Sequence, residues 1–267
     1  MATRTDRIQI SYTLTFKTPF HCGTGIREGL IDRTVVKDGQ GFLYVPGSTF
    51  KGMLRERCEQ LARMFEELDD DMRVLIADPH EEKLALRGFG STTTMITRIF
   101  GSHIQPGHLY FDDARQTDTE KSEYDDKNDR EHGKGKYKNL QFDLYTQVRL
   151  DRVTRTAVQG ALYTSEFGLR DLEFHGDIMG WLECIPINDQ AGSPTYSLLL
   201  LLAGLHMIDR LGGNKSTGKG QCECEITSVK VGDQDIKKEQ WQSWFDELDA
   251  LSLYSYSLEN TVKEEEA

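Results

Sequence analysis

Four segments of the chain are predicted to be β-strands, and in two of them, Ile8–Lys17 and Gln221–Val231, apolar and polar residues alternate. Successive side chains of a strand point to opposite faces, so such a segment can bury one face and leave the other polar. The clearest case is Ile8–Lys17, in which every second residue from Ile8 to Phe16 is apolar. The other predicted strands are Gly107–Asp112, Asp171–Ile187 and Gln221–Val231.

Three further segments have helical patterns. After Pro46-Gly47, apolar residues recur at spacings of three and four: Phe50, Met53, Leu54, Cys58, Leu61 and Phe65. This predicts an amphipathic helix with Ser48 or Thr49 as its N-cap. Ser197–Leu211 is predicted to be a buried helix ending at Gly212-Gly213, because its eight-residue apolar run is far below the roughly 20 residues of a membrane span. Lys238–Leu251 predicts an outer amphipathic helix.

The core elements follow the order strand, helix, strand, strand, helix, strand. This is the ferredoxin-like βαββαβ order of an α+β fold, which the RNA-recognition motif also uses. We predict a single domain over residues 1–267, with its core in 8–112 and 171–231. Residues 114–170 are then an insertion, and 232–267 add a C-terminal helix and an acidic tail. Fold alone does not fix function.

The insertion has two parts of different character. Ala114–Lys138 is nearly all polar or charged and is predicted to be a mobile loop, since it has little apolar surface to bury. Residues 143–170 predict an extended arm. The arm region mixes the bases Arg149, Arg152, Arg155 and Arg170 with the aromatics Phe142, Tyr145, Tyr163 and Phe167. That mixture suits stacking on nucleobases, although an amphipathic hairpin with core aromatics has the same pattern.

Three shorter segments complete the predicted organisation. Thr34–Val45 predicts a small hairpin that turns at Asp38-Gly39. Residues 66–83 and 88–94 predict a loose connection between the first helix and the second strand.

The formal net charge of −12 argues against free, nonspecific binding of a polyanion, but the charge is uneven. Residues 64–83 carry a net −6 and residues 231–267 a net −7, so the rest of the chain is close to neutral at about +1. Because local rather than total charge governs phosphate contact, the composition fits a nucleic-acid-binding subunit inside an assembly.

Cysteine use and the N-terminus bear on the compartment. The five cysteines form no C-x-x-C pair and predict reduced core thiols: Cys22, Cys58, Cys184, Cys222 and Cys224. The first residues lack the apolar block of a signal peptide. We therefore expect a cytoplasmic protein with no membrane partner.

Two segments are suited to holding phosphate. In 46–55, a helix N-terminus offers unpaired N–H groups, Ser48 and Thr49 add hydroxyls, and Lys51 and Arg55 add charge. An ordinary capped helix with solvated bases explains the same residues. The segment Gly212–Gly220 (GGNKSTGKG) is rich in glycine, which lets backbone approach a ligand and present N–H groups. Its spacing differs from that of a P-loop, and a plain flexible connection is the alternative.

Four segments together resemble the RAMP superfamily of repeat-associated CRISPR proteins, most closely its type III backbone subunit. They are HCGTG (21–25) with GLID (29–32) and VKD (36–38), VPGSTFKGMLR (45–55), IFGS (99–102) with GHLYFDDA (107–114), and LGGNKSTGKG (211–220). The arm sequences YTQV (145–148) and LDRVT (150–154) are similar to that subunit as well. The resemblance runs from about residue 8 to 230.

The resemblance implies a partner set of CRISPR guide RNA, paired target RNA and other effector subunits, including copies or paralogues of this chain. It implies a thumb-like arm that wedges between bases of the guide–target duplex. It also implies that Asp32 helps to cleave the target RNA, with Mg²⁺ or Mn²⁺ as the metal and Asp32 as a ligand or as the group that orients the attacking 2′-hydroxyl. The RNA-binding residues expected on this basis are His21, Ser48, Thr49, Lys51, Arg55, Arg152, Thr154, Arg155, Gly213, Asn214, Lys215 and Ser216.

The chain departs from the family pattern in two places. Arg33-Thr34 follows Asp32 where relatives carry a small residue and then proline, and the charged stretch 115–140 is longer than expected. His21 is interpreted as packing under the glycine turn rather than as an acid or base. His132 is interpreted as a solvated residue. His206 is interpreted as a core or edge residue of its helix. An aspartate before a hairpin is also commonly just a solvated turn residue.

Three other functions stay open. The chain could be a purely structural RNA-binding subunit, a guide-processing ribonuclease of the same superfamily, or a ferredoxin-like small-molecule enzyme or regulator.

Overall fold

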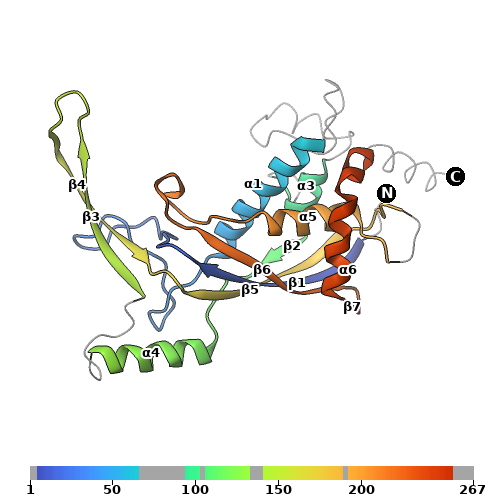
Figure 1. The fold of residues 1–267 in the computed structure, drawn as a ribbon, viewed down its shortest axis with the longest axis horizontal. Helices are drawn as coiled ribbons and strands as arrows, with labels where there is room; N and C mark the ends of the chain where they lie inside the picture. The colour runs from blue at the N-terminus through green and yellow to red at the C-terminus, as the bar shows by residue number, and fades with distance from the viewer. Residues whose placement is uncertain (1–4, 66–93, 103–105, 133–140, 189–191, 255–267) are drawn as a thin grey trace.

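The computed structural model describes residues 5–65, 94–102, 106–132, 141–188 and 192–254. A five-stranded antiparallel sheet forms the body, with strand order β2-β5-β1-β6-β7 (Figure 1). Its strands are β1 (Thr5–Phe16), β2 (Leu109–Phe111), β5 (Glu173–Glu183), β6 (Cys222–Val231) and β7 (Gln234–Ile236).

The central strand β1 fixes which face of the sheet is buried. Its apolar residues Ile8, Ile10, Tyr12, Leu14 and Phe16 are all buried, as the alternation predicts. It pairs with β5 along one side and with β6 along the other, with a register shift at Ser11/Tyr12. One face of the sheet therefore carries a continuous apolar layer, against which helices can pack.

Helices α1 (Gly47–Phe65) and α5 (Tyr196–His206) cover this layer. The Tyr12 and Phe50 rings stack with centroids 4.1 Å apart, which fixes the start of α1 over β1. The two helices also touch each other closely, because a Cβ on Gly204 would lie only 2.4 Å from Cys58 Sγ. Only glycine at this position permits that approach.

The short helix α3 (Met95–Phe100) and the C-terminal segments complete the core. Helix α6 (Lys238–Ser243) continues into the 3-10 helix η2 (Trp244–Leu253), so the predicted outer helix is helical but only its first part is α-helical. Its apolar side chains Trp241, Trp244 and Leu251 are buried. None of the helices in the described part of the chain is long and apolar enough to cross a bilayer.

The predicted ferredoxin-like order is confirmed. The core runs β1, α1, β2, β5, α5, β6, and the two strands of the central hairpin, β2 and β5, lie on the β1 side opposite β6. All four predicted strands are present within a few residues of their expected bounds. Every core pairing is antiparallel, because each βα crossover leaves one strand between the two strands that it connects: β5 lies between β1 and β2, and β1 lies between β5 and β6.

The predicted arm is a two-stranded antiparallel hairpin of β3 (Phe142–Leu150) and β4 (Ala157–Gly168) that stands away from the body (Figure 1). The aromatic residues of this region gather at its base, where Phe167 is buried and Tyr145 packs edge-on against it at 5.2 Å. The exposed apolar side chains of the arm are aliphatic: Leu144 near the base and, farther out, Val148, Leu150, Val153, Val158 and Leu162. For Phe167 the structure shows the alternative that the sequence left open, a core aromatic of the hairpin, at its base.

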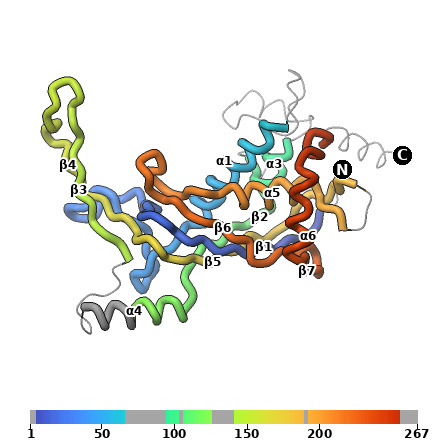
Figure 2. The backbone as a smooth tube through the Cα atoms, viewed as in Figure 1, coloured from blue at the N-terminus to red at the C-terminus, as the bar shows by residue number. Residues whose placement is uncertain are grey.

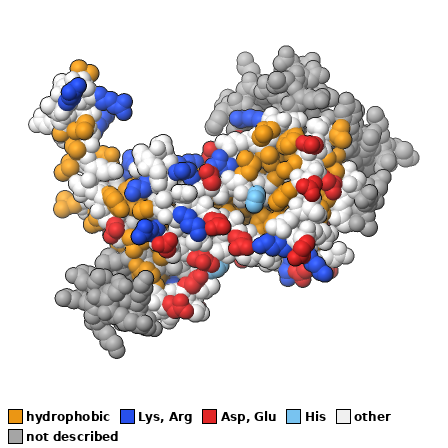
Figure 3. Space-filling view, in the orientation of Figure 1, with side chains coloured by type: hydrophobic (Ala, Val, Ile, Leu, Met, Phe, Trp, Pro, Cys, Tyr) orange, Lys and Arg blue, Asp and Glu red, His pale blue; other side chains and the backbone are white. Residues whose placement is uncertain are grey.

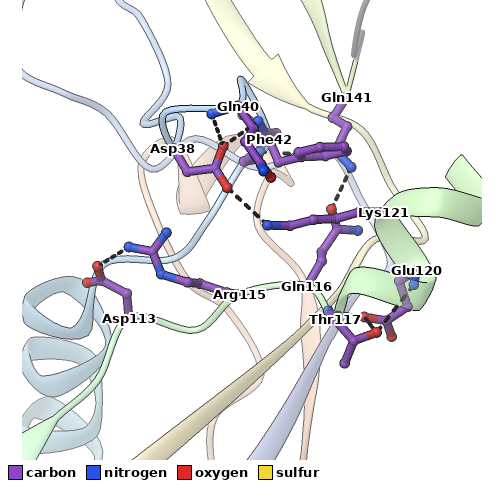
Figure 4. A network of polar contacts seen from close by, with 11 residues as sticks. Asp38, Gln40, Phe42, Asp113, Arg115, Gln116, Thr117, Glu120, Lys121 and Gln141 are labelled. Carbon is purple, nitrogen blue, oxygen red and sulfur yellow. Dashed lines mark hydrogen bonds and ion pairs between the residues drawn. The ribbon is translucent and has the colours of Figure 1, made fainter. Parts of the chain in front are cut away.

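The charged stretch after β2 is not the mobile loop that its composition predicts, because Asp118–His132 forms helix α4 (Figure 1). Polar contacts from distant residues hold its first turns (Figure 4). Lys121 Nζ lies 3.1 Å from Asp38 Oδ2, and Gln116 and Gln141 share a buried side-chain hydrogen bond just ahead of the helix. Thr117 and Glu120 bond to each other and cap it.

Two predicted helix ends are also wrong. Helix α5 stops at His206, five residues before Leu211, and Met207 closes it through backbone bonds instead of Gly212-Gly213. Ser48 and Thr49 lie inside the first turn of α1 rather than at its N-cap. The carboxylate of Asp113 caps the N-terminus of α1, since its Oδ1 accepts a hydrogen bond from Gly47 N at 3.0 Å.

The remaining predictions have mixed outcomes. The hairpin at 34–45 forms as a tight turn, with Asp38 N donating to Phe42 O at 2.8 Å. All five cysteines are free thiols, although Cys184 and Cys224 are only partly buried. The connection at 66–83 and most of 88–94 lie outside the described residues, as does the acidic tail.

Candidate functional site

Asp32 lies in a hairpin that residues 22–36 form between β1 and α1. Thr24 and Val36 pair with Thr34 and Cys22 through backbone bonds, and Glu28 and Ile31 exchange two backbone bonds at the tip. Gly29 takes the left-handed conformation that this tight turn requires, at φ 58°. The pair next to the tip is Arg27 and Asp32, so the hairpin register itself places these two residues opposite each other.

The hairpin is joined to the base of the arm through Asp32. Asp32 N donates to Thr164 O and Thr164 N donates to Asp32 Oδ2, both at 2.9 Å. Asp32 Oδ1 forms an ion pair with the Arg27 guanidinium. Figure 2 shows this segment, in blue, beside β3 and β4.

Asp32 is held as an ionised carboxylate that solvent can still reach. The backbone N–H of Thr164 is the main cause that lowers the pKa of Asp32, and the bond from Arg27 lowers it further. About a quarter of the side chain, 24%, is exposed. A group of this kind can orient a hydroxyl or hold a cation, but it is a weak general base because its pKa lies below the ordinary value.

Glu166, which no sequence motif marks, anchors the whole hairpin. Its side chain is only 3% exposed, Oε2 accepts from Val35 N and Oε1 pairs with Lys37 Nζ, both at 2.9 Å. Its backbone N–H donates to Arg33 O, and its carbonyl bonds to His21 Nδ1 at 2.8 Å. One buried residue thus fixes both sides of Asp32 to β4.

The glycine-rich loop packs against the same hairpin. Gly213 N donates to His21 O at 2.8 Å, and a Cβ on Gly212, at φ 92°, would lie 2.6 Å from that oxygen. The loop continues into the 3-10 helix Lys215–Thr217 (η1), with Asn214 left-handed at φ 62°. Asn214 Oδ1 lies 3.5 Å from Arg33 Nη1. Ser216 is exposed on this short helix.

His21 sits between the loop and the arm, half-buried, with its ring 5.5 Å from that of Phe167. Gly23 also lies directly over the ring, since a Cβ there would be 2.7 Å from Nε2. These contacts agree with the interpretation of His21 as a packing residue under the glycine turn. Contact between His21 and RNA stays a prediction.

The first turns of α1 form a second, adjacent part of the site. Ser48 is exposed and Thr49 half-buried, and Lys215 Nζ bridges to Glu56 of the same helix at 3.3 Å. Arg55 is committed within the protein to Glu59 Oε1 at 2.8 Å and Gly101 O at 3.2 Å. Partial burial and the neighbouring Arg55 lower the pKa of Lys51. An anionic ligand beside Lys51 would relieve that unfavourable environment.

The arm tip stands apart from these groups. Arg152, Thr154 and Arg155 are exposed, on a turn held by Asp151, whose Oδ1 accepts from Val153 N at 2.8 Å. Figure 3 shows blue Lys and Arg side chains at the end of the arm and orange hydrophobic ones along it. The structure therefore joins the hairpin of Asp32 to the arm base through Thr164, His21 to the arm and the glycine-rich loop, and Lys215 to α1, and it separates the arm-tip residues from them.

If a divalent cation bound at this hairpin, Asp32 would be its single protein ligand. Within the described ranges, one group of three metal-binding side chains lies together, Glu120, Glu173 and His175, and it does not include Asp32. Mg²⁺ commonly keeps several waters and binds one or two carboxylates together with substrate phosphates. Asp32 Oδ1 could serve in such a site once Arg27 no longer occupies it.

Comparisons with known proteins complete the description. The model of the RAMP superfamily matches residues 13–223, a span that includes Asp32, the arm and the glycine-rich loop. No curated protein matches the sequence. Among solved structures, a chain of the "Cryo-EM structure of the Type III-B Cmr-beta bound to cognate target RNA" aligns with a TM-score of 0.48 and 13% identity, covering 82% of this chain and 96% of that chain.

Proposed function

The chain belongs to the RAMP superfamily, and from that premise we propose that it is a backbone subunit of a type III CRISPR effector that binds guide RNA and cleaves the paired target RNA. In this proposal its partners are the guide RNA, the target RNA and neighbouring effector subunits. The guide contacts the first turns of α1 and the glycine-rich loop. Asp32 acts on the target strand beside the base of the arm.

The observation that carries the proposal is the fixed position of Asp32. Two bonds to Thr164 tie this ionised carboxylate to the base of an exposed hairpin, while part of it stays open to solvent. A nucleic-acid strand that tracks along the base of the arm would pass this carboxylate. A merely solvated turn aspartate has no need of such fixing, because water satisfies an exposed carboxylate.

The cleavage step is an attack of the target 2′-oxygen on the adjacent phosphorus. The new bond to the 2′-oxygen forms as the bond to the 5′-oxygen breaks, which leaves a 2′,3′-cyclic phosphate and a 5′-hydroxyl. Solvent takes the proton of the 2′-hydroxyl and supplies one to the leaving oxygen. Asp32 orients the attacking hydroxyl, and alignment with the splayed phosphate supplies much of the rate. Bound Mg²⁺ or Mn²⁺ would neutralise phosphate charge, with Asp32 Oδ1 as its protein ligand.

Replacing Asp32 in the assembled complex tests the catalytic part of the proposal. We expect Asp32→Ala and Asp32→Asn to lower the rate of cleavage at this subunit's position about 100-fold or more while binding of target RNA is retained. The Asn variant is informative because it keeps an oxygen for Thr164 N and loses the charge. Gel analysis of labelled target and filter binding measure the two effects.

Asp235→Ala is the matched control, because Asp235 is an exposed aspartate paired with Lys230 on the β6–β7 edge. Unchanged cleavage by both Asp32 variants would show that this subunit binds RNA without cutting it. The Arg27 ion pair, which occupies Asp32 Oδ1 in the free protein, is the observation that favours such a non-catalytic subunit.

A further inference from the structure

Arg27 is the one cation that pairs with Asp32 among the described residues, and the backbone puts it there. The two residues flank the Glu28–Ile31 pair at the tip of the hairpin, so neighbouring strands present them on one side. The pairing therefore follows from hairpin register and not from the free swing of a long surface side chain. The Arg27 side chain stays 78% exposed.

We propose that Arg27 contacts the target-RNA phosphodiester that Asp32 addresses: when the target binds, its guanidinium turns from Asp32 Oδ1 to a non-bridging phosphate oxygen. This inference rests on the proposed function and deepens it by naming a second residue that touches the reacting group. Guanidinium is suited to the task, because its planar fork carries five N–H donors and one carboxylate oxygen uses only one of them.

Electrostatic attraction favours the contact between Arg27 and the phosphodiester. An exposed arginine next to a lone carboxylate forms a pair of little net strength in water, so Arg27 costs little to reorient. The phosphodiester brings one negative charge to the same place. During attack on phosphorus its oxygens gain charge, and a cation bound to one of them then stabilises the transition state more than the bound substrate.

The neighbours of Arg27 are consistent with a nucleic-acid ligand. Arg33 follows Asp32 and is exposed, with its guanidinium 5.8 Å from the centre of the Tyr163 ring on the arm. Lys219 of the glycine-rich loop lies 4.4 Å from the centre of the Tyr145 ring. Three cations from two loops thus border the arm base, and only Arg27 is paired with Asp32 in the described structure.

The test uses the assembled complex with Arg27→Ala and Arg27→Lys, beside Asp32→Ala. We expect Arg27→Ala to lower the single-turnover cleavage rate about 10- to 100-fold with target affinity changed less than about threefold. Arg27→Lys should recover part of the rate, since lysine keeps the charge and loses the fork. The control is Arg63→Ala, another exposed arginine paired with a glutamate, Glu59, at the end of α1.

A second readout does not depend on cleavage. With a target that carries a 2′-deoxy nucleotide at the cleavage position, Arg27→Ala should reduce the slope of log affinity against log salt by about 0.7 to 0.9, the loss of one phosphate contact. A merely structural role for Arg27 would leave this slope unchanged.

The outcomes separate this inference from the function it rests on. If Asp32→Ala abolishes cleavage while Arg27→Ala cleaves normally, or faster because Asp32 Oδ1 is freed, the role of Arg27 is wrong and the proposed function stands. An unchanged salt slope likewise rejects the phosphate contact. If Asp32→Ala itself cleaves normally, the catalytic function fails.

Discussion

At the scale of single residues, the buried carboxylate of Glu166 determines whether Asp32 is in place. We predict that Glu166→Gln lowers the free energy of unfolding by about 1–3 kcal/mol, because it leaves Lys37 without its partner in a largely dry site. Lys37 is 26% exposed, so water relieves part of that cost. Cleavage should fall as well, while guide binding at α1 is retained. Chemical denaturation and the cleavage assay measure the two effects.

The control for Glu166 is Glu223→Gln, which breaks the exposed pair with Lys17 and should change stability by less than about 0.5 kcal/mol. The double variant Glu166→Gln with Lys37→Met should recover stability relative to the single one, since it removes the unpaired cation. If Glu166→Gln is as stable as the control variant, Glu166 does not anchor the hairpin.

The comparison of Asp32 with Glu166 shows what sequence could supply at this scale. Asp32 was predicted because it stands in a short motif of neighbouring residues. Glu166 was not, since it bonds to Val35 and Lys37 across 131 and 129 positions, and no local pattern records such pairings. The same holds for Arg27, whose importance depends on the turn at Glu28–Ile31 that sets it opposite Asp32.

At the scale of elements, α4 shows why a correct reading of composition can still give the wrong structure. The helix has almost no apolar face, so the packing that usually holds a surface helix contributes little, although Tyr124 packs against the core. Its first turns are held by ion pairs and hydrogen bonds to Asp38 and to His175 of β5. Strands such as β1 were predictable because alternation is a local signal, whereas these contacts join distant segments.

Acid should therefore release α4 before it unfolds the sheet. Partial burial acts to raise the pKa of Glu120, but the bonds from His175 and Thr117 outweigh it, and the pKa lies below the ordinary 4.5. A carboxylate with a lowered pKa contributes stability that is present above its unfolded pKa and lost as pH falls through the folded pKa. Partial burial also acts to raise the pKa of Asp38, but the bond from Lys121 and two backbone bonds lower it below the ordinary value. Its contribution to stability is therefore lost on acidification as well.

We expect amides of residues 118–125 to lose hydrogen-exchange protection as pH falls below about 4.5, while those of β1 and β5 stay protected. Exchange detected by mass spectrometry, corrected for the intrinsic pH dependence, measures this. Glu120→Gln should weaken protection at neutral pH and flatten its pH dependence. Protection that persists equally at pH 6 and pH 4 in the unmodified protein would contradict the ionic docking of α4.

At the scale of the whole molecule, the arm carries positive charge at its tip, away from the body, although the net charge of the chain is −12. Arg149, Arg152 and Arg155 are exposed at or near its end, and the arm has its own two-stranded sheet rather than a share of the core. Charge at the tip should consequently affect ligand binding and not folding. We predict that Arg152→Glu with Arg155→Glu leaves the free energy of unfolding within about 0.5 kcal/mol of the unmodified value.

The same double variant should weaken binding of guide or guide–target RNA and reduce the slope of log affinity against log salt by about 1.5, because each lost phosphate contact removes roughly 0.7 to 0.9. Filter binding across a salt series measures it, and Lys230→Glu with Lys238→Glu, on the β6–α6 side of the body, is the charge-matched control. Equal slopes for the arm variant and the unmodified complex would mean that the arm meets protein rather than phosphate. Its exposed aliphatic side chains would then be the contact surface, and the arm would join subunits instead of dividing the duplex.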